Sequence, residues 1–142
     1  MANSDREDGF TLIELLVVII IIGILSAIAI PVFLNQRTKG YDAAAESDVR
    51  FVAENMEIYL NDKNSYGTIA DMSANGQLID ASDQVTVTIV RYNGTNGYCL
   101  SSRHLSSPTT WHWDSQAGGL QAKSATGCPT TTSGSAGGSV SG

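Results

Sequence analysis

The fold of this chain is decided by residues 9–34, GFTLIELLVVIIIIGILSAIAIPVFL. Twenty consecutive residues from Leu15 to Leu34 carry no charge, and as a helix they reach about 30 Å, the thickness of a bilayer's hydrocarbon core. A buried helix of a soluble protein is usually shorter and rarely apolar on every face. A cleaved secretory signal has a basic start and a shorter apolar run, whereas the flank MANSDREDG (1–9) is mostly acidic. Residues 10–34 are therefore predicted to form a transmembrane helix that stays in the mature protein.

The helix is predicted to run from Phe10 to Asn61 and to become amphipathic in its second half. Apolar residues recur at steps of three and four from Tyr41 to Leu60, which defines one helical face. Pro31 removes a backbone donor and clashes with the preceding turn, so a kink is expected there, and Gly40 is a second weak point. The opposite face carries carboxylates, Asp42, Glu46, Glu54 and Glu57.

After the helix comes a loop, in which residues 69–74 could form a helical turn. In the remainder of the chain the apolar residues recur with a period of two, which indicates strands. These runs are VTVTIVRY (85–92), YCLSSRHL (98–105), TTWHWD (109–114) and a short LQAK (120–123), with NGTNG (93–97) as a hairpin turn. The predicted fold is α+β: a long kinked helix packed on a C-terminal antiparallel sheet of three or four strands. Residues 35–129 form this head, and the Gly/Ser/Thr-rich residues 130–142 are predicted to be disordered.

Charge is unevenly distributed along the head. Residues 40–83 hold nine acidic and two basic residues, a net charge of −7, whereas residues 84–142 hold three basic residues and one acidic, a net charge of +2. The simpler interpretation is a solvated helix beside a less charged sheet. The alternative is that the sheet of one copy meets the helix of another.

The chain has two cysteines, Cys99 and Cys128, with His104 and His112 between them. A zinc site usually shows close ligand pairs, which these spacings lack, so a disulfide is favoured over zinc. Such a bond forms in an oxidising compartment and places the head outside the cytoplasm. The basic residues Arg37 and Lys39 after the apolar segment, against Arg6 before it, would favour the opposite topology.

No pattern in the sequence indicates an enzyme or a cofactor site. There is no Gly-rich phosphate loop and no nucleophile elbow. Ser101, His104 and Asp114 could be drawn as a triad but carry no spacing signal, and Asp114 alone is too little for calcium, which takes six or more oxygens. One titratable residue does call for a function: Glu14 lies at the start of the uncharged span, where a carboxylate is costly and usually has a partner unless it snorkels to the membrane surface.

The stretch GFTLIELLVVIIIIGILSAIAIP (9–31) closely resembles the N-terminal signature of type IV pilins and their relatives. A long helix with a C-terminal sheet and a late cysteine pair agrees with the lollipop fold of that family. The resemblance implies that residues 1–9 are a leader cut by a prepilin peptidase between Gly9 and Phe10. It also implies that the new amino group of Phe10 is methylated.

The resemblance further implies a role for Glu14 in filament assembly. In the family the precursor waits in the cytoplasmic membrane and is then stacked with its copies into a helical surface filament, whose core is built from the apolar helices. The glutamate matching Glu14 is thought to pair with the amino terminus of a neighbouring subunit, and such a pair sets the register because a misplaced subunit leaves a buried charge unmatched. Gly23 and Pro31, also at family positions, would let the helix bend during packing.

Other functions are open at this point. A pseudopilin of a type II secretion-like system has the same fold, although major pseudopilins often lack the cysteine pair and bind calcium. A competence pilin that binds DNA is disfavoured by the net acidic chain. A bitopic membrane protein with an outer ligand-binding domain predicts no cleavage and no filament.

The mature protein is expected to begin at Phe10. Replacing Gly9 by a bulky residue should leave uncleaved precursor in the membrane, because a side chain at this position obstructs the approach of a protease to the bond. Intact-mass measurement of purified filaments checks the native cut. Filaments whose subunits retain residues 1–9 would contradict the pilin interpretation.

Overall fold

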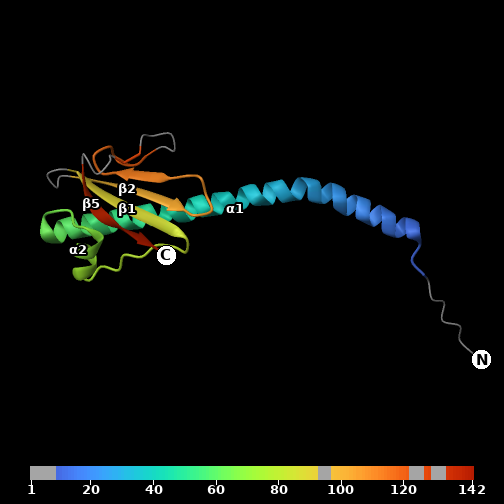
Figure 1. The fold of residues 1–142 in the computed structure, drawn as a ribbon, viewed down its shortest axis with the longest axis horizontal. Coiled ribbons are helices and arrows are strands. Elements are labelled where there is room, and N and C mark those ends of the chain that lie inside the picture. Colours follow the sequence, from blue (N-terminus) through green and yellow to red (C-terminus); the bar gives the residue numbers. More distant parts are fainter. Residues whose placement is uncertain (1–8, 93–96, 122–126, 129–133) are drawn as a thin grey trace, which may run out of the picture. The chain divides into compact units, whose positions relative to one another are not determined.

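The computed structural model describes residues 9–92, 97–121, 127–128 and 134–142, and it divides into two compact units, residues 1–37 and 38–142. Its longest element is helix α1 (Leu12–Lys63), which begins in the first unit and ends in the second (Figure 1). The helix predicted for residues 10–61 is thus confirmed. It continues through Gly23, Pro31 and Gly40, and the expected kink at Pro31 stays a prediction.

The second unit is built on one face of α1. The apolar stripe predicted from the spacing is confirmed, because Ala45, Val49, Val52 and Met56 are all buried. Ala53 joins them. Ala45, Val49, Val52 and Met56 follow one another at steps of three or four, and Ala53 lies four residues after Val49, so all of them point from the same side of the helix.

Within the described residues, five antiparallel strands form the sheet, in the order β4-β3-β2-β1-β5. A tight turn joins β3 to β4: Gly118 and Gly119 have positive φ angles of 88° and 99°, and the Asp114 carboxylate accepts from the backbone N–H groups of Gln116 and Ala117. Glycine is favoured at positive φ because it has no Cβ. The strands are β1 (Val85–Tyr92), β2 (Tyr98–His104), β3 (Trp111–Asp114), β4 (Gly119–Leu120) and β5 (Gly134–Ser141).

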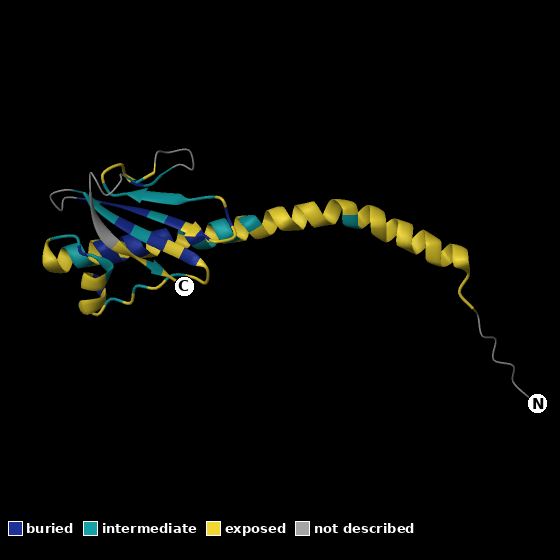
Figure 2. Ribbon diagram, in the orientation of Figure 1, coloured by how far each residue is buried: buried dark blue, intermediate teal, exposed yellow. Residues whose placement is uncertain are grey.

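Alternation along β1 and β2 gives the sheet two different faces (Figure 2). The inner face, against α1, carries Val85, Val87 and Ile89 of β1 with Tyr98 and Leu100 of β2, and these side chains complete one core with the α1 stripe. The residues between them point to the opposite, outer face. The predicted cover of the amphipathic helix by the apolar face of the sheet is confirmed.

The C-terminal tail was predicted to be disordered, and from Gly134 to Ser141 this prediction is wrong. These residues form β5, an edge strand paired with β1 from Tyr92↔Gly134 to Thr86↔Ser141. The C-terminus is held at the start of β1, where Gln84 N–H donates to the Gly142 carbonyl and Gly142 N–H donates to the Val85 carbonyl. A Gly/Ser-rich segment can be a strand here because an edge needs only backbone donors and acceptors. Residues 130–133, the rest of that tail, lie outside the described residues.

The shorter elements lie at or close to their predicted positions. Helix α2 (Ile69–Ala74) has the predicted limits, and its capping box joins Thr68 and Asp71. The short strand predicted at 120–123 is present as β4 at Gly119–Leu120. Residues 122–123 and most of the predicted hairpin turn (93–96) lie outside the described residues, as do residues 1–8 of the predicted leader.

Two carboxylates of α1 hold loops onto the helix. The Asp48 carboxylate accepts from Ser82 N–H and Ser82 Oγ at 2.7 and 2.9 Å. Asp42, which was predicted to point away from the sheet, instead accepts from Ser107 and Thr109 in the loop between β2 and β3. Buried carboxylates are stable when donors satisfy them, so these contacts fix both loops.

The predicted disulfide is present between Cys99 and Cys128, whose Cα atoms lie 5.5 Å apart. Cys99 faces outward from β2, opposite Val90 of β1 and Asp114 of β3. Cys128 lies in the chain between β4 and β5, which are the two opposite edges of the sheet. The bond therefore attaches the connection between the two edges to a central strand.

Replacing both cysteines by alanine is expected to lower the free energy of unfolding by roughly 3–4 kcal/mol, the chain-entropy value for a closed loop of about thirty residues. Urea unfolding of the detergent-solubilised chain measures it. Ser101→Ala, a neighbour on the same outer face, is the matched control and should change stability by less than about 0.5 kcal/mol. An unchanged unfolding midpoint in the double-alanine variant would contradict this role of the disulfide.

Candidate functional site

The start of α1 is organised around Glu14. Gly9 and Phe10 precede the helix and are exposed, and Thr11 caps its first turn. The Glu14 N–H donates to Thr11 Oγ1 at 3.3 Å, while the Thr11 N–H and hydroxyl both donate to Glu14 Oε2, at 2.9 and 2.7 Å. This reciprocal pattern is a capping box.

The capping box gives Glu14 a local partner that the sequence analysis missed. The signal was present, because Thr-Leu-Ile-Glu at 11–14 is the T-x-x-E pattern of a capping box. Both hydrogen bonds that the Glu14 side chain accepts from Thr11 use the one carboxylate oxygen Oε2. Glu14 is therefore held in a fixed orientation at the end of the helix, beside the residues at which cleavage is predicted.

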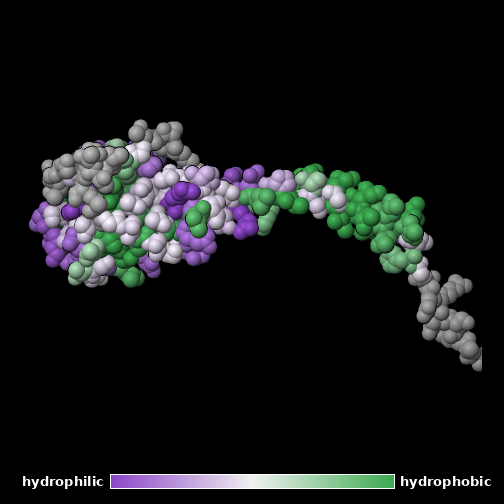
Figure 3. Space-filling model, viewed as in Figure 1, coloured by the Kyte–Doolittle hydropathy of each residue, from purple (hydrophilic) through white to green (hydrophobic). Residues whose placement is uncertain are grey.

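The first unit leaves its apolar side chains uncovered. From Phe10 to Leu34 the large hydrophobic residues are all exposed, and the side of the segment visible in Figure 3 is almost wholly apolar. Among the described residues, α1 is the one helix that is long and apolar enough to cross a bilayer. An apolar surface of this extent requires lipid or other protein around it.

Gly23 and Pro31 lie within this uncovered part of α1. A Cβ atom added at Gly23 would meet nothing within 4 Å, so no contact inside this chain requires a glycine there. Pro31 lies inside the helix and cannot donate to the Ala27 carbonyl. Both residues weaken the helix, and their predicted role in bending stays a prediction.

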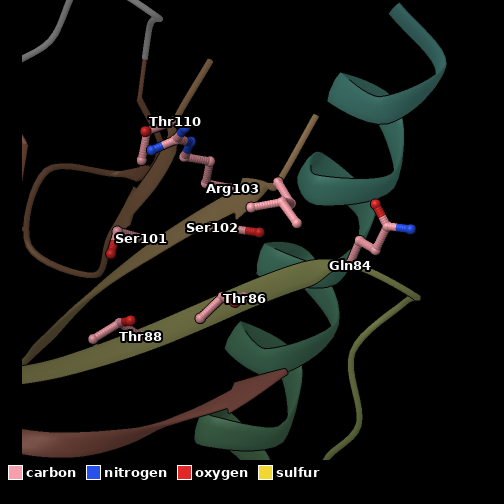
Figure 4. Close-up of a pocket in the computed structure, with 8 residues that line it drawn as sticks. Gln84, Thr86, Thr88, Ser101, Ser102, Arg103 and Thr110 are labelled. Atoms are coloured by element: carbon pink, nitrogen blue, oxygen red, sulfur yellow. The ribbon is translucent and has the colours of Figure 1, made fainter. Parts of the chain in front are cut away.

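The outer face of the sheet carries a shallow polar depression (Figure 4). Thr86 and Thr88 of β1 and Ser101 of β2 form its floor, and Arg103 extends beside Thr110 at one side. The residues that line it include one basic residue and no acidic one. An arginine among hydroxyl groups favours a carboxylate or another anion as a contact.

The remaining candidate residues do not form a reactive site. Ser101 and Asp114 lie on the outer face of the sheet, whereas His104 is buried on the inner side and stacks on Tyr41, with ring centroids 4.1 Å apart. These three residues therefore do not form a triad. Both cysteine sulfurs are used in the disulfide, which contradicts the zinc alternative. In the described part of the chain no three His, Cys, Asp or Glu side chains come together as metal ligands.

Comparisons with known proteins agree with this architecture. The family model described as the prokaryotic N-terminal methylation motif matches residues 4–30, which include Gly9, Phe10 and Glu14. The type IV wide pilus major component PilA4 of Thermus thermophilus is 37% identical over 103 residues, which is 72% of this chain and 77% of that protein.

Two further relatives each match about half of this chain. The type II secretion system core protein G of Escherichia coli is 34% identical over 68 residues, 48% of this chain and 47% of that protein. The type IV major pilin protein PilA of Myxococcus xanthus is 36% identical over 68 residues, 48% of this chain and 31% of that protein. The N-terminal motif, the long apolar helix, the antiparallel head and the similarity to PilA4 over most of both chains together show that this protein belongs to the family of type IV pilins and their pseudopilin relatives.

Proposed function

We propose that this chain is the structural subunit of a type IV pilus, assembled from the membrane into a helical surface filament. The observation that supports this most is the first unit, whose apolar side chains are exposed all around the helix. Such a helix needs hydrocarbon in the monomer and the same helix of other copies in a filament. The similarity to a wide pilus major component over 77% of that protein supports the same function.

Processing would precede assembly. The precursor would reside in the cytoplasmic membrane with residues 10–34 as its anchor and with the disulfide-bonded head outside. A prepilin peptidase would cut between Gly9 and Phe10, and the amino group of Phe10 would then be methylated. The match of the N-terminal methylation motif to residues 4–30 supports this order of events.

Glu14 would then act as the register device of the filament. Its carboxylate is already oriented by Thr11 through Oε2, so little side-chain freedom remains to be lost when a neighbour arrives. The partner would be the amino group of Phe10 on the next subunit. A buried carboxylate and a buried ammonium are each costly alone, and pairing offsets part of that cost.

A pseudopilin of a type II secretion system is the second candidate. It is favoured by the similarity to the secretion system core protein G of several bacteria, which the chain matches over about half of their length. Both candidates share cleavage and a filament built on the apolar helix. They differ in whether long filaments reach the cell surface, so imaging of a deletion strain distinguishes them.

Glu14→Leu is expected to abolish or severely shorten filaments while leaving the membrane precursor in place. Leaving the neighbour's ammonium unpaired in an apolar core costs about 3–5 kcal/mol, and this cost recurs at every subunit. The measurement compares membrane pilin by immunoblot with filaments sheared from the surface.

Two further variants separate the charge of Glu14 from its role in the cap. Glu14→Gln keeps a capping-box residue but removes the charge, so it should lose filaments as Glu14→Leu does. Thr11→Ala weakens the cap by about 0.5–2 kcal/mol but keeps the charge, so it should still assemble. Normal filament yield from Glu14→Gln would show that the charge does not set the register.

A further inference from the structure

The face of α1 that points away from the sheet carries a small mixed patch. Phe51, Glu54 and Ile58 are spaced i, i+3 and i+7, so they lie on one side of the helix. Phe51 is 40% exposed and Ile58 is 53% exposed, so both large apolar side chains are accessible to a partner. We call these three residues the helix patch.

Glu54 is the free carboxylate of this helix. Among the described residues it has no hydrogen bond and no ion pair, and it lies at the centre of the helix patch. The other carboxylates on α1 from residue 40 onward all have a partner within the chain: Asp42 with Ser107, Glu46 with Arg50, Asp48 with Ser82, Glu57 with Tyr98 and Asp62 with Asn75. Glu54 is therefore the carboxylate of this part of the helix that is available for an external contact.

The polar depression on the outer face of the sheet carries a cation, the charge opposite to that of Glu54. Its cation, Arg103, donates from Nε to the Ser107 carbonyl at 3.1 Å, which fixes the guanidinium. In the described part of the chain both Nη groups of Arg103 remain without an acceptor. Beside it, Leu105 is 75% exposed, and Thr86 and Thr88 add methyl groups to the floor. We call the residues Thr86, Thr88, Ser101, Arg103, Leu105 and Thr110 the sheet patch.

The helix patch and the sheet patch cannot meet within one molecule. The helix patch lies on the side of α1 opposite its buried stripe, and the sheet patch lies on the side of the sheet opposite its core face. The two patches therefore bound the second unit on opposite sides, with the core between them. Two different patches that complement each other make a head-to-tail contact, and such a contact repeats into an open filament when it does not close into a ring.

We propose that the helix patch of one copy docks on the sheet patch of the next, with Glu54 of the first bound by the free Nη groups of Arg103 of the second. Phe51 and Ile58 would then cover Leu105 and the threonine methyl groups. A planar guanidinium held at one nitrogen presents its remaining N–H groups to a carboxylate in fixed geometry. The net charges of −7 for residues 40–83 and +2 for residues 84–142 favour the same orientation. This inference rests on the proposed assembly into a filament and names a contact between heads in it.

A charge exchange in the full-length chain, expressed with its own assembly machinery, tests the contact. Glu54→Arg and Arg103→Glu should each lower the yield of sheared filaments about tenfold or more, because a repulsive contact is repeated at every subunit. The double variant restores an opposite pair and should return to within about twofold of the native yield. Membrane pilin measured by immunoblot, with the disulfide checked on a non-reducing gel, confirms that each variant folds.

A matched control separates the specific pair from net charge. Asp80 is an exposed carboxylate in the loop before β1, and Asp80→Arg combined with Arg103→Glu has the same net charge as the exchange pair. This combination should not restore filaments. Rescue by the control, or no rescue by the exchange pair, overturns the proposal and would leave Arg103 as a contact for another anion.

The remaining outcomes are also decisive. Native filament yield from either charge-reversed single variant overturns this contact but not the proposed function. Native chain that is cleaved and abundant in the membrane yet forms no filament overturns the proposed function itself. If a charge-reversed variant fails to accumulate, Glu54→Gln and Arg103→Gln take its place: loss of filaments in both supports the contact, and native yield in either overturns it.

Discussion

One continuous helix has to satisfy two environments, and the rest of the structure depends on that constraint. In hydrocarbon every backbone polar group must be paired within the segment, and a helix does so alone. In the part of the helix after Pro31 the apolar residues are confined to one stripe, which β1 and β2 cover. The sheet is therefore a cover for one side of α1, and the other side of α1 and the outer side of the sheet are what the head presents to its surroundings.

The acidic residues on the second half of α1 make different contacts, although the amino-acid composition of this segment suggests a uniformly solvated face. Asp42 and Asp48 hold two loops against the helix. Glu57 accepts from the buried Tyr98 hydroxyl at 3.0 Å, and burial together with this carboxylate raises the pKa of Tyr98 far above its ordinary value. These groups stabilise the head from within, so fewer carboxylates remain free for an external contact than the sequence suggests.

Glu14 and Glu54 lie in similar surroundings, and in both proposed contacts one partner is oriented in advance. Each has apolar side chains as neighbours on the helix, and neither takes part in an ion pair in the described chain. Glu14 is pre-oriented by a capping box, and Arg103, the proposed partner of Glu54, is pre-oriented by a backbone carbonyl. Groups that are fixed before they bind lose little freedom on binding, which suits contacts that must form at every subunit of a filament.

The sequence by itself determined the features that depend on local periodicity and on residue chemistry. The apolar span, the buried stripe from Ala45 to Met56, helix α2 and strand β1 follow from spacing alone, and the pair of cysteines predicted the disulfide. The capping box of Thr11 and Glu14 was equally readable at 11–14. Only the tertiary structure decided β5, since edge pairing uses backbone groups that every Gly/Ser-rich segment has. It alone decided which carboxylates are used, because Asp48 and Ser82, or Asp42 and Ser107, are distant in sequence and meet only once helix and sheet have packed.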